Sequence, residues 1–162
     1  MTASARLFAV RVGTLMLAAL SLGLSFAHLM EAPPRLHWSP ELWMAATTFG
    51  GEYFLFGNIG AVIEIGGVGA ALYLSRLSRS RPGGELALGG ALLLALALVC
   101  WLAVVFPANQ AMAGWTPAYT PPDFDQIRAR WETGHALMAG LKLTAFAALL
   151  ISALQETRAP RT

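Results

Sequence analysis

Four long apolar segments, separated by shorter polar connections, make up most of the chain. They cover residues 7–30, 52–74, 86–106 and 125–154. A helix needs about 20 consecutive apolar residues to cross the hydrocarbon core of a bilayer, and each segment reaches that length. The pattern therefore predicts an all-α fold, a four-transmembrane-helix bundle that forms one domain over residues 1–162.

The last segment carries its ionisable residues on one side. Spaced three, four or seven residues apart, as on one face of a helix, these are Arg128, Glu132, His135 and Lys142. A neighbouring row repeats small residues at every fourth position: Ala136, Gly140, Thr144, Ala148 and Ser152. Small residues let helices approach closely in lipid, so both sides are expected to face other helices.

Polar positions in the first two segments follow the same spacing. In the second segment Glu64 shares a stripe with small residues at positions 57, 60, 67 and 71. In the first segment one face carries Thr14, Ser21, Ser25 and His28. A lone charge at the bilayer centre costs about 2.5–3.5 kcal/mol on insertion scales. Glu64 and Lys142, at similar depth, are therefore expected to form a structural ion pair.

Proline positions predict where helices end. Pro33 and Pro34 are expected to end the first helix, because proline cannot donate a backbone hydrogen bond, and the third is expected to end at Pro107.

A short additional helix is expected between the first two segments. Ser39 followed by Pro40 is typical of a helix start. Trp38 and Trp43 suggest that this helix lies at the membrane surface, where indole rings collect. Gly50 and Gly51 would separate it from the second segment.

Composition supports a membrane location. Of the 162 residues, 56% are hydrophobic and 12% are charged, and the mean hydropathy is +0.57. Soluble domains carry about 25% charged residues. The net charge of +2 gives no reason to expect nucleic-acid binding. Cys100 is the only cysteine, which excludes an internal disulfide and a CxxC motif.

Arginines predict the orientation of the chain. They gather near both termini and in the connection between the second and third segments, at positions 76, 79 and 81. The positive-inside rule places these regions in the cytoplasm. We therefore expect a multi-pass protein of the inner (cytoplasmic) membrane with both termini cytoplasmic. The first segment resembles a signal peptide but is too long for one, so we expect it to be retained.

With this orientation, polar residues from all four segments collect near the non-cytoplasmic ends of the helices. They are His28, Glu31, Glu52, Asn109, Glu132 and His135. Because four helices contribute to the same level, this cluster is the candidate functional site.

Three chemical interpretations of the cluster remain open, beside a structural one in which its members only hydrogen-bond between helices. In the first, iron is held by the ligands His28, Glu31, Glu132 and His135, since a Glu-x-x-His spacing places two ligands on one helical face. In the second, His28 and His135 hold a haem iron from two helices. In the third, no metal takes part: His135 is the general base, and Arg128 or Asn109 stabilises the anion that forms.

Three stretches of the sequence are similar to a known family. They are residues 27–33 (AHLMEAP), 106–109 (FPAN) and 130–136 (RWETGHA). Together they resemble the anthrone oxygenase-like family of small bacterial and fungal membrane proteins (domain of unknown function 1772), over most of the chain. The resemblance implies a four-helix membrane fold and, for a few members, oxidation of the central carbon of an anthrone to an anthraquinone. It implies as site positions His28, Asn109, Arg130, Trp131, Glu132 and His135.

These observations lead to two functional hypotheses. The first is an oxidoreductase within the lipid bilayer that acts on a lipophilic small molecule at the cluster, using iron, haem or no cofactor. The second is a non-catalytic accessory subunit of a larger membrane complex, bound through the Gly-rich second helix. Gly66 and Gly69 lie off the Glu64 stripe and would supply a second close-packing surface.

Overall fold

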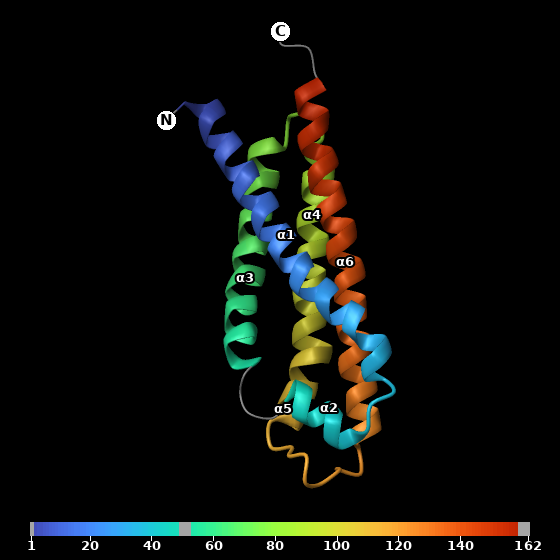
Figure 1. The fold of residues 1–162 in the computed structure, drawn as a ribbon. Coiled ribbons are helices and arrows are strands. Elements are labelled where there is room, and N and C mark those ends of the chain that lie inside the picture. Colours follow the sequence, from blue (N-terminus) through green and yellow to red (C-terminus); the bar gives the residue numbers. More distant parts are fainter. Residues whose placement is uncertain (1, 49–52, 159–162) are drawn as a thin grey trace.

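The computed structural model describes residues 2–48 and 53–158, which form a bundle of long helices (Figure 1). Four helices are long and apolar enough to cross a membrane, with spans Ser4–Arg35, Gly57–Leu77, Gly84–Met112 and Phe124–Gln155. The predicted all-α bundle of four transmembrane helices is confirmed. Large apolar side chains are exposed on every span, as a lipid-facing surface requires; examples are Phe8, Val62, Leu96 and Leu143.

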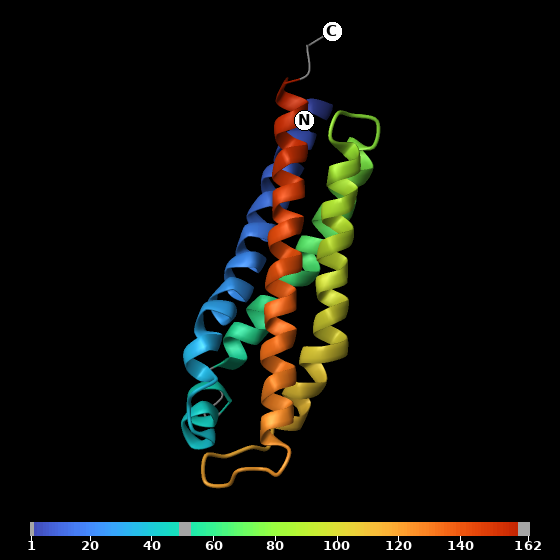
Figure 2. The same ribbon diagram turned by 90° about the vertical axis from the view of Figure 1, so that its right-hand side faces the viewer.

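The elements follow one another in a simple order. They are α1 (Ala3–Arg35), α2 (Pro40–Thr47), α3 (Tyr53–Ser78), α4 (Gly84–Cys100), the π-helix η1 (Trp101–Val105), α5 (Phe106–Met112) and α6 (Phe124–Arg158). The third span consists of α4, η1 and α5 in one continuous run. The short helices α2 and α5 lie at the same end of the bundle, here called the α2 end. Both termini lie at the opposite, terminal end (Figures 1 and 2).

The four long helices form a square. The main contacts join α4 to α6, α1 to α6, α3 to α4 and α1 to α3. Helices α3 and α6 therefore occupy diagonal corners. One buried apolar cluster fills the α2 end and includes Trp43, Trp131 and Met138. A second fills the half toward the terminal end and includes Leu74, Leu94 and Leu149.

Close contact between α4 and α6 depends on a glycine. A Cβ atom added at Gly90 would lie 2.7 Å from Leu149 Cγ and 3.0 Å from Ala145 O. Of the row of small residues expected to make close contacts on α6, Gly140 and Thr144 are exposed, Ala136 and Ala148 are half-buried and Ser152 is buried. The ionisable stripe takes the centre of the inward face instead, and this turns the small row toward the edge.

Both predicted proline ends are wrong. Helix α1 continues through Pro33 and Pro34 to Arg35. The two prolines stand in its last turn, and the helix closes with a bond from Leu36 N–H to Ala32 O at 3.0 Å. Each proline removes only one helical donor, so the loss near a helix end is small.

Pro107 likewise stands inside the third span. It cannot donate to Ala103 O, four residues earlier. Arg130 of α6 donates from Nη2 to that carbonyl at 2.9 Å instead. The guanidinium satisfies the backbone acceptor that the proline leaves unpaired, and the helix continues to Met112.

The short helix α2 begins as expected, with the Leu42 amide bonded to Ser39 Oγ at 3.4 Å. Its expected place at the membrane surface is wrong for Trp43, which is completely buried. Gly50, Gly51 and Glu52 lie outside the described residues.

Candidate functional site

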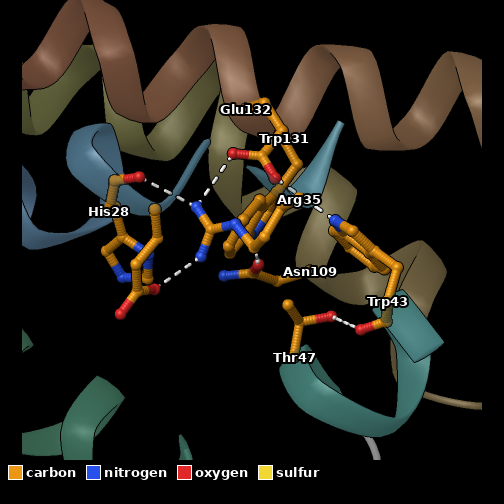
Figure 3. A network of polar contacts seen from close by, with 8 residues as sticks. His28, Arg35, Trp43, Thr47, Asn109, Trp131 and Glu132 are labelled. Carbon is orange, nitrogen blue, oxygen red and sulfur yellow. Dashed lines mark hydrogen bonds and ion pairs between the residues drawn. The ribbon is translucent and has the colours of Figure 1, made fainter. Parts of the chain in front are cut away.

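An arginine and a glutamate are ion-paired inside the α2 end of the bundle (Figure 3). Arg35, the last residue of α1, places Nη2 at 2.9 Å from Glu132 Oε2 on α6. The two side chains are 4% and 6% exposed. Arg35 also donates to Glu31 Oε2 and to the backbone oxygen of His28, each at 2.9 Å. One cation thus joins two helices and holds the backbone of His28.

The second oxygen of Glu132 is bonded by a tryptophan from α2. Trp43 Nε1 donates to Glu132 Oε1 at 3.2 Å (Figure 3). The indole ring also meets Trp131 and Phe124 edge to face, with ring centroids 5.6 Å apart in both pairs. Trp43 is therefore part of the site, and α2 is attached to the bundle core through it.

Trp131 is held from two sides. Its Nε1 donates to Asn109 Oδ1 at 2.8 Å, and the Arg35 guanidinium carbon lies 5.1 Å from the centre of its ring. Asn109, expected as an anion-stabilising group, thus orients an aromatic ring (Figure 3). The π-helix just before α5 contributes to this placement: buried positions step from 100 to 105 across it, instead of by the usual three or four residues. Such single π-turns are frequent at functional sites.

The two histidines expected at the site are in ring contact. His28 of α1 and His135 of α6 are stacked, with centroids 4.2 Å apart and planes 26° from parallel. Both rings meet Trp131 edge to face, at 5.3 Å and 4.4 Å. The histidines therefore line one side of the tryptophan, while Arg35 lies over it.

His135 Nδ1 and Arg35 Nε of this cluster are buried and have no hydrogen-bond partner among the described residues. Buried polar atoms are normally paired. Arg35 Nε is a donor, and His135 Nδ1 is an acceptor when the ring proton is on Nε2. These two atoms are therefore the ones that a ligand or a water molecule at the site could bond.

Glu64 and Lys142, expected to pair, are bonded to each other in the centre of the bundle. Lys142 Nζ also donates to Ser25 Oγ of α1 at 2.7 Å. The lysine side chain is fully buried, whereas that of Glu64 is 13% exposed. Three helices thus meet at one ammonium group.

Arg128 does not join the site. The expectation that it stabilises an anion there is therefore corrected. It donates to Asp125 Oδ1 at 2.9 Å and to the backbone oxygen of Trp38 at 3.4 Å. It lies one turn before Glu132 at the surface, where it connects α6 to the chain before α2. The buried cation that takes its place is Arg35.

The proposed iron ligands do not come together. Among the described residues, no three His, Cys, Asp or Glu side chains form a group that could hold a metal ion. Glu132 has both oxygens bonded to Arg35 and Trp43. The Glu31 side chain is 62% exposed and pairs with Arg35.

The histidine pair also does not fit a haem in this arrangement. Two axial ligands must approach iron from opposite faces of the porphyrin. The rings of His28 and His135 are stacked on one another, and this leaves no room for a porphyrin between them.

The sequence pattern does not predict Arg35 and Trp43 as site residues, because it places both in the connection beyond the first helix. A signal for Arg35 was present: it stands seven residues after His28 and continues the polar face of Ser21, Ser25 and His28. The prolines hid this regularity. No comparable pattern marks Trp43, which reaches Glu132 only through the fold.

The cluster combines an imidazole that can take a proton with a buried guanidinium that can bind an anionic oxygen, in surroundings that exclude bulk water. Compared with protein-family models, with curated proteins and with solved structures, the chain matches none.

Proposed function

We propose that this protein is an oxidoreductase of the oxygenase type, which acts within the bilayer on a flat, lipophilic substrate such as an anthrone. The observation that carries the proposal is the pair of buried, unpartnered atoms at the site, His135 Nδ1 and Arg35 Nε. The first can accept a proton when the ring carries its own on Nε2, and the second can donate to an oxyanion. Oxidation of an acidic CH₂ whose anion carries its charge on a conjugated carbonyl oxygen across the ring needs both.

The reaction converts the central CH₂ of an anthrone and dioxygen to a carbonyl and water. His135 takes a proton from the CH₂, which is acidic because the resulting anion is an aromatic phenolate, and Arg35 binds the phenolate oxygen. Dioxygen accepts electrons from the carbanion, a C–O bond forms, and the imidazolium returns its proton to give a hydroperoxide. Removal of the second proton then breaks the O–O bond, and hydroxide leaves with a proton as water.

The remaining residues position these groups. Glu132 orients the Arg35 guanidinium, and Trp43 holds Glu132. Asn109 holds Trp131, whose ring contacts both histidines.

The test is oxidation of an anthrone by the protein purified in mild detergent, with product absorbance and oxygen consumption compared with protein-free autoxidation. His135→Phe is expected to lower kcat by about 100-fold or more, the usual effect of losing a general base. Arg128→Gln is the control and should retain the wild-type rate. Full turnover in His135→Phe, or a wild-type rate equal to autoxidation, would refute the proposal.

The cofactor is tested on the same preparation. Elemental analysis detects stoichiometric iron, and a Soret band detects haem. Either result would assign the oxygen-activating step to the bound group, while proton transfer at His135 would remain.

We also propose that the protein lies in the inner membrane with its termini in the cytoplasm. Arginines at the terminal end support this orientation; they are Arg6, Arg11, Arg76, Arg79 and Arg81. Because Cys100 is buried, new cysteines can report on sidedness. A membrane-impermeant maleimide should label Thr120→Cys in spheroplasts and Ser80→Cys only after lysis; the reverse pattern would invert the orientation.

A second candidate function is that of an accessory subunit bound through α3. It is favoured by the open space around Gly57 and Gly69, where an added Cβ would meet nothing within 4 Å. Gly69→Leu should then abolish co-purification of a membrane partner while the bundle stays folded. Anthrone oxidation by the isolated protein would favour the first candidate instead.

A further inference from the structure

The ion pair at the centre of the bundle joins two helices that make little other contact. Lys142 of α6 reaches Glu64 of α3 across the diagonal of the square, and Ser25 of α1 completes the contact. The pair therefore lies near the bundle axis. Ionisable groups at this depth are costly and are a functional-site hypothesis by default.

A row of polar groups leads from this pair toward the α2 end. Ser25 and His28 stand three residues apart on one face of α1, and the His28 ring stacks on His135. Lys142 follows His135 by two helical turns, and its side chain leans back toward it, since helical side chains tilt toward the N-terminus. The Ser25 hydroxyl can both accept and donate a hydrogen bond. Ser25 and Lys142 are therefore the polar groups between the histidines and Glu64.

Toward the terminal end the described interior holds apolar side chains and hydroxyl groups. Side chains from all four long helices fill it: Ala18, Ala71, Leu74, Leu94, Ala145 and Leu149. The buried hydroxyls there belong to Thr14, Ser21, Ser75, Ser78 and Ser152. Among the described residues no ionisable side chain is buried between Lys142 and the terminal end, so the row of ionisable groups leads toward the α2 end only.

Of the two carboxylates inside the bundle, Glu64 is the one with a single bonded oxygen among the described residues. Glu132 accepts bonds at both oxygens, whereas Glu64 contributes only Oε1 to Lys142 and its side chain is 13% exposed. The ionisable groups that interact with Lys142, besides Glu64, are His28 from α1, His135 from α6 and the buried thiol of Cys100 from α4. None of them is an anion that would compete with Glu64 for the proton.

We infer that Glu64, Lys142 and Ser25 form a proton-loading site in the middle of the membrane, which exchanges protons with the α2 end through His28 and His135. A protonated histidine delivers its proton through Ser25 to Lys142, and the Lys142 ammonium transfers one of its own to the Glu64 carboxylate. The histidine ends neutral, Lys142 stays an ammonium and Glu64 becomes a carboxylic acid. One proton moves and the total charge is unchanged.

The test is infrared difference spectroscopy on the protein reconstituted in phosphatidylcholine vesicles, with the buffer stepped from alkaline to acidic pH. The wild type should gain a deuterium-sensitive C=O band of a buried carboxylic acid. The band should be missing in Glu64→Gln and in Glu64→Gln/Lys142→Met, the second of which has no lone buried charge. It should persist in Glu31→Gln, which changes an exposed carboxylate.

The route is tested by the rate at which the band appears. In His28→Phe and His135→Phe it should form at least about tenfold more slowly, as expected when a proton-transfer group is lost. If the band forms in both variants at the wild-type rate, the route is wrong. If no Glu64-dependent band forms at any pH where the helices persist, the pair is a permanently charged connection and the inference is wrong.

This outcome is independent of anthrone oxidation. A wild type that shows the Glu64 band but oxidises no anthrone would refute the proposed function and support the proton-loading site.

Discussion

Arg35 and Glu132, 97 residues apart in the chain, meet at 2.9 Å between Nη2 and Oε2 and join the last turn of α1 to α6. Their charges are held where water is excluded, so the pair depends on further bonds from Glu31, Trp43 and the His28 backbone. Removal of Arg35 would leave the Glu132 carboxylate buried without a counter-charge, whereas removal of Glu132 would leave Arg35 paired with Glu31 alone. The α2 end of the bundle is organised around this contact.

Arg35→Met is expected to destabilise the protein by about 3–5 kcal/mol, because it leaves the Glu132 carboxylate buried and unpaired. Arg35→Met/Glu132→Met should recover part of the loss, since an apolar pair of similar volume carries no desolvation penalty. Unfolding in mixed detergent and SDS micelles measures both. Arg128→Met, at a partly exposed ion pair, is the control and should change stability little.

Glu64→Gln should destabilise the bundle by leaving Lys142 without its counter-charge, and Lys142→Met in addition should restore part of the stability. The coupling energy from the double-mutant cycle measures the contact directly. Additive losses in the two single variants would mean that the side chains do not meet in the folded protein.

Arg130→Ala should reduce stability by about 1 kcal/mol, because the Ala103 carbonyl loses its donor. In that background Pro107→Ala should be stabilising, since an alanine N–H can donate to the same carbonyl from within the helix. The sign of the Pro107→Ala effect in the presence and absence of Arg130 is the decisive measurement. If Pro107→Ala changes stability equally with and without Arg130, the arginine does not replace the missing backbone donor.

Two adjacent glycines offer a matched test of helix packing. Gly90→Ala should destabilise by about 1–3 kcal/mol, because the new methyl group would overlap Leu149 and the Ala145 carbonyl. Gly89→Ala meets nothing within 4 Å and should gain up to about 1 kcal/mol from helix propensity. A similar result for both variants would show that α4 and α6 do not approach as closely as described.

Hydrophobic length and helical spacing were enough to predict the four spans. The same spacing placed His28, Glu132 and His135 on inward faces at one level, and the penalty for a lone charge in lipid indicated that Glu64 and Lys142 pair. These inferences succeed because both quantities are properties of one helix and its depth. They require no knowledge of which helix is the neighbour, only that a polar face packs against protein and not against lipid.

Proline positions did not predict where the helices end, because that depends on groups outside the helix. Whether a helix continues through Pro33 or Pro107 depends on what satisfies the carbonyls that each proline leaves without a donor. At Pro107 the answer is Arg130, on a different helix. Which of Arg128 and Arg35 is the buried cation also depends on the packing between helices. Helical spacing does not distinguish them, because both stand at helical spacing from a site residue.

The sequence by itself determined that this chain crosses a membrane four times and which faces of its helices turn inward, since burial in lipid allows no unpaired backbone and few charges. Only the tertiary structure decided which arginine pairs with Glu132 and that Trp43 is buried and donates to the same carboxylate. It also decided that the third span continues through its proline, with a π-helix before Pro107 and Arg130 bonded to the Ala103 carbonyl. Each of these depends on a hydrogen bond between groups far apart in the chain, and such a bond exists only once the helices have packed.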